Sequence, residues 1–168
     1  SGIAGATVLA AVEAGVDAVD AAMDAFSGGT SQPCLGSIVE GLAHTERDTG
    51  LDPEAVRQIS FYWEAVRTQY AAFESDLKAP ASEVYLHEMP GGQFTNLKEQ
   101  ARSLGLETRW HEVALAYRAA NDLLGDIVKV TPSSKVVGDL ALMMPSQDLT
   151  PDDILDPAKE VAFPASVV

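Results

Sequence analysis

The chain has 168 residues, which is the length of about one domain and allows a single sizeable core. Its 11 Lys and Arg residues face 25 Asp and Glu residues, so the formal net charge is −14. This surplus of acid repels nucleic-acid backbones and anionic lipid, and no apolar run approaches the roughly 20 residues that span a bilayer. Nucleic acid and membrane are therefore excluded as expected partners, and the composition predicts a folded, soluble protein.

The cysteine content and the N-terminus bear on the cellular compartment. Cys34 is the only cysteine, and the first residues lack the basic start and cleavage site of a signal peptide. We expect a reducing, cytoplasmic setting. Because Ser1 to Ala6 lead directly into an apolar helical pattern without an initiator Met, we also expect the chain to be part of a longer polypeptide.

The first 33 residues predict a helix, a short strand and a loop. Residues 4–14 are rich in Ala, Val and Leu, and Gly15 follows them as a glycine follows a helix. Residues 16–21 alternate apolar and acidic side chains, which is typical of a strand with one buried face. Residues 27–33 are rich in Gly, Ser and Pro and predict a loop. Helix, glycine and strand in this order indicate an α/β unit.

Two helices are predicted between residues 35 and 70. The first covers residues 35–44. Asp52 supplies an N-cap and Pro53 suits the first position of the second helix, which covers residues 54–70. The apolar residues of this second helix recur every three or four positions and should form one stripe: Val56, Ile59, Tyr62, Trp63, Val66 and Tyr70.

The segment from residue 73 to residue 124 predicts one weak strand and two helices. Residues 84–86 are the strand-like triplet, and the turn at residues 90–92 follows them. The helices cover residues 96–104, closed by Gly105, and residues 108–124. One face of the second helix is apolar and consists of Trp110, Val113, Ala114, Tyr117 and Ala120 or Asn121.

The last part of the chain begins with a β-branched run at residues 127–130, which Thr131 and Pro132 stop. A helix is predicted over residues 133–144, where Pro145 interrupts it. Another short helix should start at Thr150, and the tail from Asp156 is irregular.

The three histidines do not predict a metal site. His44, His87 and His111 are widely separated, and no second cysteine is present. Zinc ligands usually occur in close pairs, so we expect each histidine to be a surface or packing residue.

Residues 88–93 place a proline and two glycines before a helix. Such a turn can present backbone N–H groups to an anion. It lacks the Lys-Ser/Thr of a phosphate loop and the spacing of a dinucleotide fingerprint, so a tight turn is the simpler interpretation.

Residues 130–135 allow two interpretations. Thr131 has the residue type of an N-cap and Pro132 suits a first helical position, which predicts a capped helix start. The functional interpretation places the Thr131 hydroxyl at the same helix start. A hydroxyl can give and accept a proton at one atom, and Lys135 and the helix N-terminus provide positive potential near it. Thr131 is thus a candidate for passing a proton between two bound partners.

Three segments together carry a resemblance to a known family. They are residues 27–33 (Ser-Gly-Gly-Thr-Ser-Gln-Pro), 89–97 (Met-Pro-Gly-Gly-Gln-Phe-Thr-Asn-Leu) and 128–139 (Val-Lys-Val-Thr-Pro-Ser-Ser-Lys-Val-Val-Gly-Asp). In this order they resemble the carboxyltransferase domain of the pyruvate carboxylase family, and the likeness extends over essentially all 168 residues. Gln93 and Lys135 favour this branch over the related oxaloacetate decarboxylase and transcarboxylase subunits, which remain an alternative.

The resemblance implies an activity, cofactors and partners. The family transfers CO2 from carboxybiotin to pyruvate and forms oxaloacetate, in a homotetramer. Thr131 matches the threonine that carries a proton from the pyruvate methyl group to biotin, and Ser134 and Lys135 match residues of the carboxybiotin pocket. The family also uses a divalent metal, zinc or manganese, whose ligands fall outside this chain.

The resemblance also implies a fold. Residues 1–33 correspond to the last helix-strand unit of a TIM barrel, and residues 34–168 to a mostly helical extension, with the remainder of the barrel as a partner. Pro145 departs from the family, which usually carries a valine there. A competing hypothesis is that the chain is a non-catalytic helical module whose apolar stripes pack on another protein.

Overall fold

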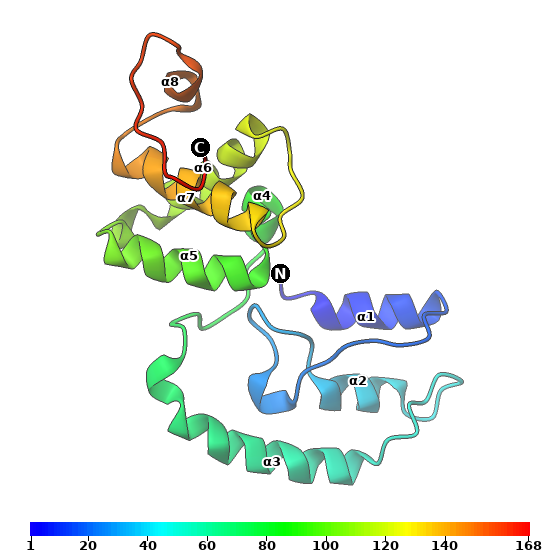
Figure 1. The fold of residues 1–168 in the computed structure, drawn as a ribbon. Helices are drawn as coiled ribbons and strands as arrows, with labels where there is room; N and C mark the ends of the chain where they lie inside the picture. Colours follow the sequence, from blue (N-terminus) through cyan, green and yellow to red (C-terminus); the bar gives the residue numbers. More distant parts are fainter. The chain divides into compact units, whose positions relative to one another are not determined.

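The computed structural model describes residues 1–168 and is helical throughout (Figure 1). Helices contain 56% of the residues and no strand is present. The sequence predicts an α/β unit, whereas the regular secondary structure of this chain is entirely helical. Two compact units divide at residue 82: residues 1–82 and residues 83–168. The predicted domain boundary at residue 33 falls inside the first unit and stays a prediction.

The first unit contains three α-helices and two short 3₁₀ helices. In chain order these are α1 (Ala4–Glu13), η1 (Asp24–Phe26), α2 (Leu35–Leu42), α3 (Pro53–Gln69) and η2 (Ala71–Phe73). The helix ends follow the local signals in the sequence. Gly15 has φ +96° just beyond α1, a conformation that favours glycine. The Asp52 side chain accepts a 2.9 Å hydrogen bond from the Glu54 N–H and caps α3, whose first residue is Pro53, as predicted.

The strand predicted for residues 16–21 does not form in this chain. The nearest β interaction is a single parallel bridge between Ala22 and Cys34. In this bridge the Ala22 N–H donates to the Pro33 carbonyl and the Leu35 N–H donates to the Ala22 carbonyl, each at 2.9 Å. A strand needs a neighbouring strand to satisfy its backbone groups, and these 168 residues supply none to residues 16–21.

The apolar stripe predicted on α3 forms, but most of it is exposed. Val56 is buried and Val66 is half-buried. α2 and η1 pack against α3, yet they leave the other members of the stripe at 36–61% exposure: Ile59, Tyr62, Trp63 and Tyr70. The core of the first unit is correspondingly small and lies between α1 and α2, around Val12, Ile38 and Leu42.

The second unit has the larger core. It contains α4 (Val84–His87), α5 (Gly91–Ser103), η3 (Glu107–Arg109), α6 (Trp110–Leu123), α7 (Ser133–Ser146) and α8 (Pro151–Leu155). α6 and α7 pack extensively against each other, and α5 packs against α7 (Figure 1). The stripe predicted on α6 is buried here, with Val113 and Tyr117 inaccessible to solvent. None of the helices combines the length and apolar character needed to cross a bilayer.

Two local predictions in the second unit are wrong. Residues 84–86 form the helical turn α4 instead of a strand, because the N–H groups of His87 and Glu88 bond the carbonyls of Glu83 and Val84; Glu88, with φ +56°, ends this turn. Pro145 does not stop α7, which continues to Ser146. The proline lies in the last turn, where it removes one backbone donor while the N–H groups of Gln147 and Leu149 still bond to Met143 and Met144.

Candidate functional site

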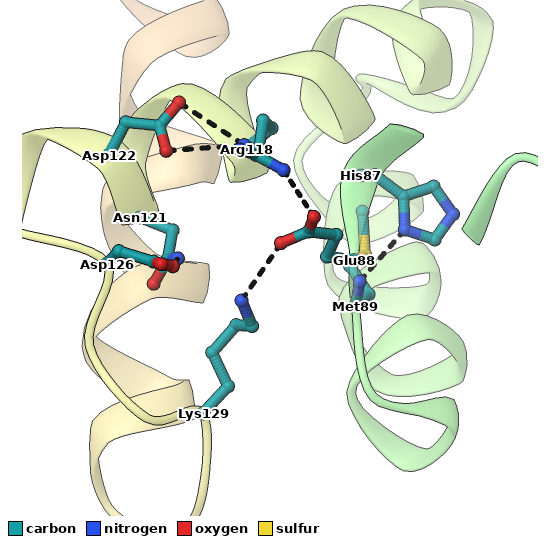
Figure 2. A network of polar contacts seen from close by, with 8 residues as sticks. All are labelled: His87, Glu88, Met89, Arg118, Asn121, Asp122, Asp126 and Lys129. Carbon is teal, nitrogen blue, oxygen red and sulfur yellow. Dashed lines mark hydrogen bonds and ion pairs between the residues drawn. The ribbon is translucent and has the colours of Figure 1, made fainter. Parts of the chain in front are cut away.

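The α6–α7 connector, residues 124–132, carries Thr131. At its start, the Asp126 N–H donates to the Asn121 carbonyl at 2.8 Å, and the Asn121 amide donates to the Asp126 carboxylate at 2.6 Å (Figure 2). Asp126 has φ +54°, a region that Asp and Asn tolerate better than most residues. This pair ends α6 and fixes the direction in which the connector leaves it.

The end of the connector is held by Ser133 instead of Thr131. The Ser133 hydroxyl donates to the Val130 carbonyl at 2.7 Å, contacts the Val128 carbonyl and accepts from the Val130 N–H at 3.2 Å. α7 begins at Ser133, and Pro132 precedes it without a side-chain cap. The predicted N-cap at Thr131 is therefore wrong, because α7 starts at Ser133, one residue after the expected first position Pro132, and the Ser133 hydroxyl satisfies the turn.

The middle of the connector is joined to the turn after α4 by a carboxylate and two cations, which we call the Glu88 clamp: Glu88, Arg118 and Lys129. Figure 2 shows Glu88 between the other two, with one carboxylate oxygen directed at each. The Lys129 ammonium lies 3.4 Å from Glu88, and Arg118 also bonds Asp122 at 3.2 Å. The clamp thus links two of the motifs that the sequence shows separately, at residues 88–93 and 128–135.

The three residues predicted for the site lie together at the end of the connector. Thr131 and Lys135 are exposed and Ser134 is half-buried in the first turn of α7. Lys135 forms an ion pair with Asp139, whose carboxylate also accepts a 2.5 Å hydrogen bond from the Ser166 hydroxyl. Residues 131–135 therefore carry two hydroxyl groups, of Thr131 and Ser134, and the ammonium group of Lys135. Because Thr131 is exposed, its hydroxyl is accessible to a bound molecule.

The sequence does not single out the residues that support the site. Glu88 belongs to the predicted turn at residues 88–93, and Arg118, Asp139 and Ser166 have no sequence signal of their own. Lys129 has one, because it is a cation inside a β-branched run of a strongly acidic chain. A charged residue in such a run needs a partner, and Glu88 supplies it from 41 residues away.

The turn predicted at residues 88–93 is confined to residues 88–90, since residues 91–93 already belong to α5. α5 begins at Gly91, and the helix start has no side-chain cap. The nearby carboxylate of Glu88 is engaged by the clamp, and Gln93 packs against Gly138 of α7. The turn therefore connects α4 to α5 and sets the approach of α5 to α7.

The three histidines have different surroundings. His44 and His111 are exposed, whereas His87 is buried. The His87 Nδ1 accepts a 3.0 Å hydrogen bond from the Met89 N–H, and its ring stacks on Phe94 at 5.4 Å between centroids. Burial lowers the pKa of His87, which keeps the imidazole neutral.

The side chains of this chain do not fit a metal ion. No group of three or more His, Cys, Asp or Glu side chains is placed to bind one. The residues near Thr131 offer hydroxyl and ammonium groups, which are poor ligands for zinc or manganese.

Comparison with known proteins identifies the family. The family model described as "Conserved carboxylase domain" matches residues 84–168, which is nearly the whole second unit. A pyruvate carboxylase of Aspergillus niger is 53% identical over 163 residues, covering 97% of this chain and 14% of the relative. Pyruvate carboxylase 1 of Caenorhabditis elegans is 51% identical over 170 residues, again with 14% of the relative covered. The chain thus spans about one seventh of the length of these relatives.

Solved structures agree over the full length. The carboxyltransferase domain of Rhizobium etli pyruvate carboxylase, solved with oxamate and biotin, is 81% identical with a TM-score of 0.98, over 99% of this chain and 28% of that one. The same domain with pyruvate and biocytin matches equally well, with 81% identity and a TM-score of 0.98. Because both units are covered by these matches, the chain belongs to the conserved carboxylase domain family and is similar to part of the carboxyltransferase domain of pyruvate carboxylases.

Proposed function

We propose that this chain is the C-terminal part of a carboxyltransferase domain that forms oxaloacetate from pyruvate, with Thr131 as the residue that moves the proton. The observation that carries the proposal is the exposed Thr131 hydroxyl beside Ser134 and Lys135, in a segment that matches the family over its whole length. The Rhizobium etli domain has been solved with pyruvate and biocytin, which are the two reactants or their analogues.

In the proposed role, Thr131 accepts one proton and donates one proton. Its hydroxyl oxygen accepts a proton from the pyruvate methyl group while its own proton leaves toward the biotin nitrogen. The C–H bond of pyruvate breaks, and the resulting enolate forms a C–C bond to CO2. Carboxybiotin supplies that CO2 as its N–C bond breaks, and the biotin nitrogen left behind takes the proton of the Thr131 hydroxyl. Thr131 ends the reaction as a neutral hydroxyl, so no charge remains on the side chain.

Ser134 and Lys135 are proposed to bind the biotin group. The ureido ring carries an oxygen that accepts hydrogen bonds, and both residues are donors on the first turn of α7. The Lys135–Asp139–Ser166 contacts hold the ammonium group near that turn and tie it to the C-terminal tail. The metal of the family is proposed to be bound by residues outside this chain.

The proposal extends to the fold of the complete domain. Residues 1–33 are proposed to be the last helix-strand unit of its barrel, in which residues 16–21 pair with a strand outside this chain. The exposure of Val16 and Val19 supports this, since both are apolar residues of this segment that nothing in the chain buries. The exposed stripe of α3 would likewise pack against the rest of the domain, although the same stripe favours the alternative of a non-catalytic module that binds another protein.

The experiment that tests the function is a substitution in the complete carboxylase that carries this chain. Thr131→Ala should abolish oxaloacetate formation and leave bicarbonate-dependent ATP cleavage intact, because the proton transfer occurs only at the carboxyltransferase site. Thr108→Ala is the matched control, since Thr108 is an exposed threonine of η3. Oxaloacetate formation at the wild-type rate by the Thr131→Ala variant would show that the assignment is wrong and would favour the non-catalytic alternative.

A further inference from the structure

The segment that carries Thr131 has few packing contacts of its own. Ile127 packs against the core of the second unit, but Val128 and Val130 are 76% and 60% exposed. Apolar burial therefore does not fix the backbone immediately before Thr131. Polar contacts hold it instead: Ser133 closes the turn after it, and Lys129 reaches back to Glu88 (Figure 2).

Lys129 ties the connector to another element, the turn after α4. Its side chain is only 17% exposed, and its ammonium group lies 3.4 Å from Glu88. An ammonium group with little access to water loses more from an absent partner than an exposed one does. Lys129 stands two residues before Thr131, so a shift of its ammonium group would be transmitted through one intervening residue.

Glu88 is itself held in place from both sides. It lies between His87 and Met89, which are 3% and 2% exposed and are joined by the hydrogen bond from the Met89 N–H to the His87 ring. Its second carboxylate oxygen bonds Arg118, which Asp122 orients one turn further along α6. The Glu88 carboxylate is thus held on its own element and binds the Lys129 side chain of the connector.

We propose that Glu88 is a positioning residue, which acts through Lys129 to hold the Thr131 hydroxyl where the proton is transferred. This inference rests on the proposed function of Thr131. Glu88 does not touch the reactants in this account; it fixes the connector. A displacement of about 1 Å of a reacting group is enough to lower a rate about 100-fold, so a small loosening of the connector would be visible in kcat.

The test uses four variants of the complete carboxylase. Glu88→Gln removes the negative charge of the carboxylate that binds Lys129. Lys129→Met removes the ammonium group while keeping an unbranched side chain. Each should lower kcat for oxaloacetate formation by at least about tenfold with the KM for pyruvate within about twofold, because positioning affects the transfer step and not pyruvate binding. Lys129→Arg keeps the charge and should restore most of kcat. Lys159→Met is the matched control, since it breaks the 2.6 Å ion pair with Asp153, which lies away from the connector.

The double variant Glu88→Gln/Lys129→Met gives a second readout. If both residues act through one ion pair, the double variant should be no slower than the slower single variant, because the link is already broken. A merely structural role would instead lower kcat, ATP cleavage and melting temperature together. If Glu88→Gln fails to fold, the comparison of Lys129→Met with Lys129→Arg decides the question.

The outcomes separate this inference from the proposed function. If Thr131→Ala is inactive but Glu88→Gln and Lys129→Met retain wild-type kcat, the positioning role is overturned and the function of Thr131 stands. If Thr131→Ala is fully active, the proposed function itself fails. A Lys129→Arg variant as slow as Lys129→Met would also contradict the proposal, since the charge would then not be what matters.

Discussion

Gly138 lies in α7 at its contact with α5, where there is no room for a side chain. A Cβ atom built at this position would lie 2.4 Å from Nε2 of Gln93 and 3.2 Å from Cδ1 of Leu97. The Gln93 amide is the end of a flexible side chain and can move aside. Leu97 is inaccessible to solvent and packed into the core, so it has little freedom to move. We therefore predict that Gly138→Ala destabilises the second unit.

The magnitude is the difference between two opposing contributions. Alanine is favoured over glycine by about 1 kcal/mol in a helix interior, whereas overpacking of a core costs about 1–3 kcal/mol. The free energy of unfolding should therefore fall by up to about 2 kcal/mol. Gly92→Ala on α5 is the matched control, because no atom lies within 4 Å of its Cβ position. That change should raise the free energy of unfolding, by about 0.5 kcal/mol.

Urea unfolding of the chain, followed by circular dichroism, measures both changes. Adding Gln93→Ala to Gly138→Ala should leave most of the lost stability unrecovered, since the Gln93 amide can move aside and Leu97 still obstructs the new methyl group. The reasoning would be refuted if Gly138→Ala shifted the urea midpoint upward, as Gly92→Ala should. It would also be refuted if the Gln93→Ala background removed the whole cost of Gly138→Ala.

Three further changes test other parts of the structure. Pro145→Val should raise the melting temperature, because the N–H regained in the last turn of α7 adds about 1 kcal/mol; an unchanged or lower value would show that Pro145 does not strain the helix. Tyr117→Phe should leave stability unchanged or higher in thermal unfolding, since the buried Tyr117 hydroxyl has no hydrogen-bond partner, and a large loss would reveal a contact that the structure lacks. Burial lowers the pKa of His87, so its contribution to stability should be complete above about pH 6.5 and be lost as the pH falls below it. In urea titrations His87→Asn should flatten this pH dependence, whereas the exposed control His111→Asn should keep it; equal slopes in all three proteins would contradict the assignment.

The helices could be predicted from the sequence wherever a local hydrogen bond defines their ends. Asp52 and Thr150 cap α3 and α8 through their own side chains, and both helices begin at the proline that follows. Such signals act within four residues and depend on nothing else in the fold. For this reason α3 and α8 start with the caps that the sequence predicts, whereas α7 starts at the predicted residue Ser133 but without the predicted Thr131 cap, because the Ser133 hydroxyl satisfies the turn.

The errors concern contacts between distant residues. Residues 16–21 have the pattern of a strand, but a pattern does not provide the neighbouring strand that the backbone needs. The periodicity of α3 correctly predicts one apolar face, yet periodicity does not specify what covers that face. Burial is a property of the partners as well as of the helix itself.

In the candidate site, too, the local contacts could be predicted from the sequence and the contacts between distant residues could not. Thr131, Ser134 and Lys135 lie within five residues, so one motif was enough to bring them together. The Glu88 clamp joins residues that are 30 and 41 positions apart, and only the packing of α4 and the connector against α6 makes them neighbours. A single sequence contains no signal for such a pairing beyond the presence of a cation among apolar residues.

The central claim is that the Thr131 hydroxyl carries the proton that leaves pyruvate. Its most direct test is the amount of oxaloacetate formed for each ATP cleaved by the complete carboxylase with Thr131→Val, compared with Thr131→Ser. Valine keeps the shape of threonine without the hydroxyl, whereas serine keeps the hydroxyl. We predict that the Thr131→Ser enzyme forms oxaloacetate and that the Thr131→Val enzyme cleaves ATP without forming it. Equal yields of oxaloacetate from the two variants would contradict the claim.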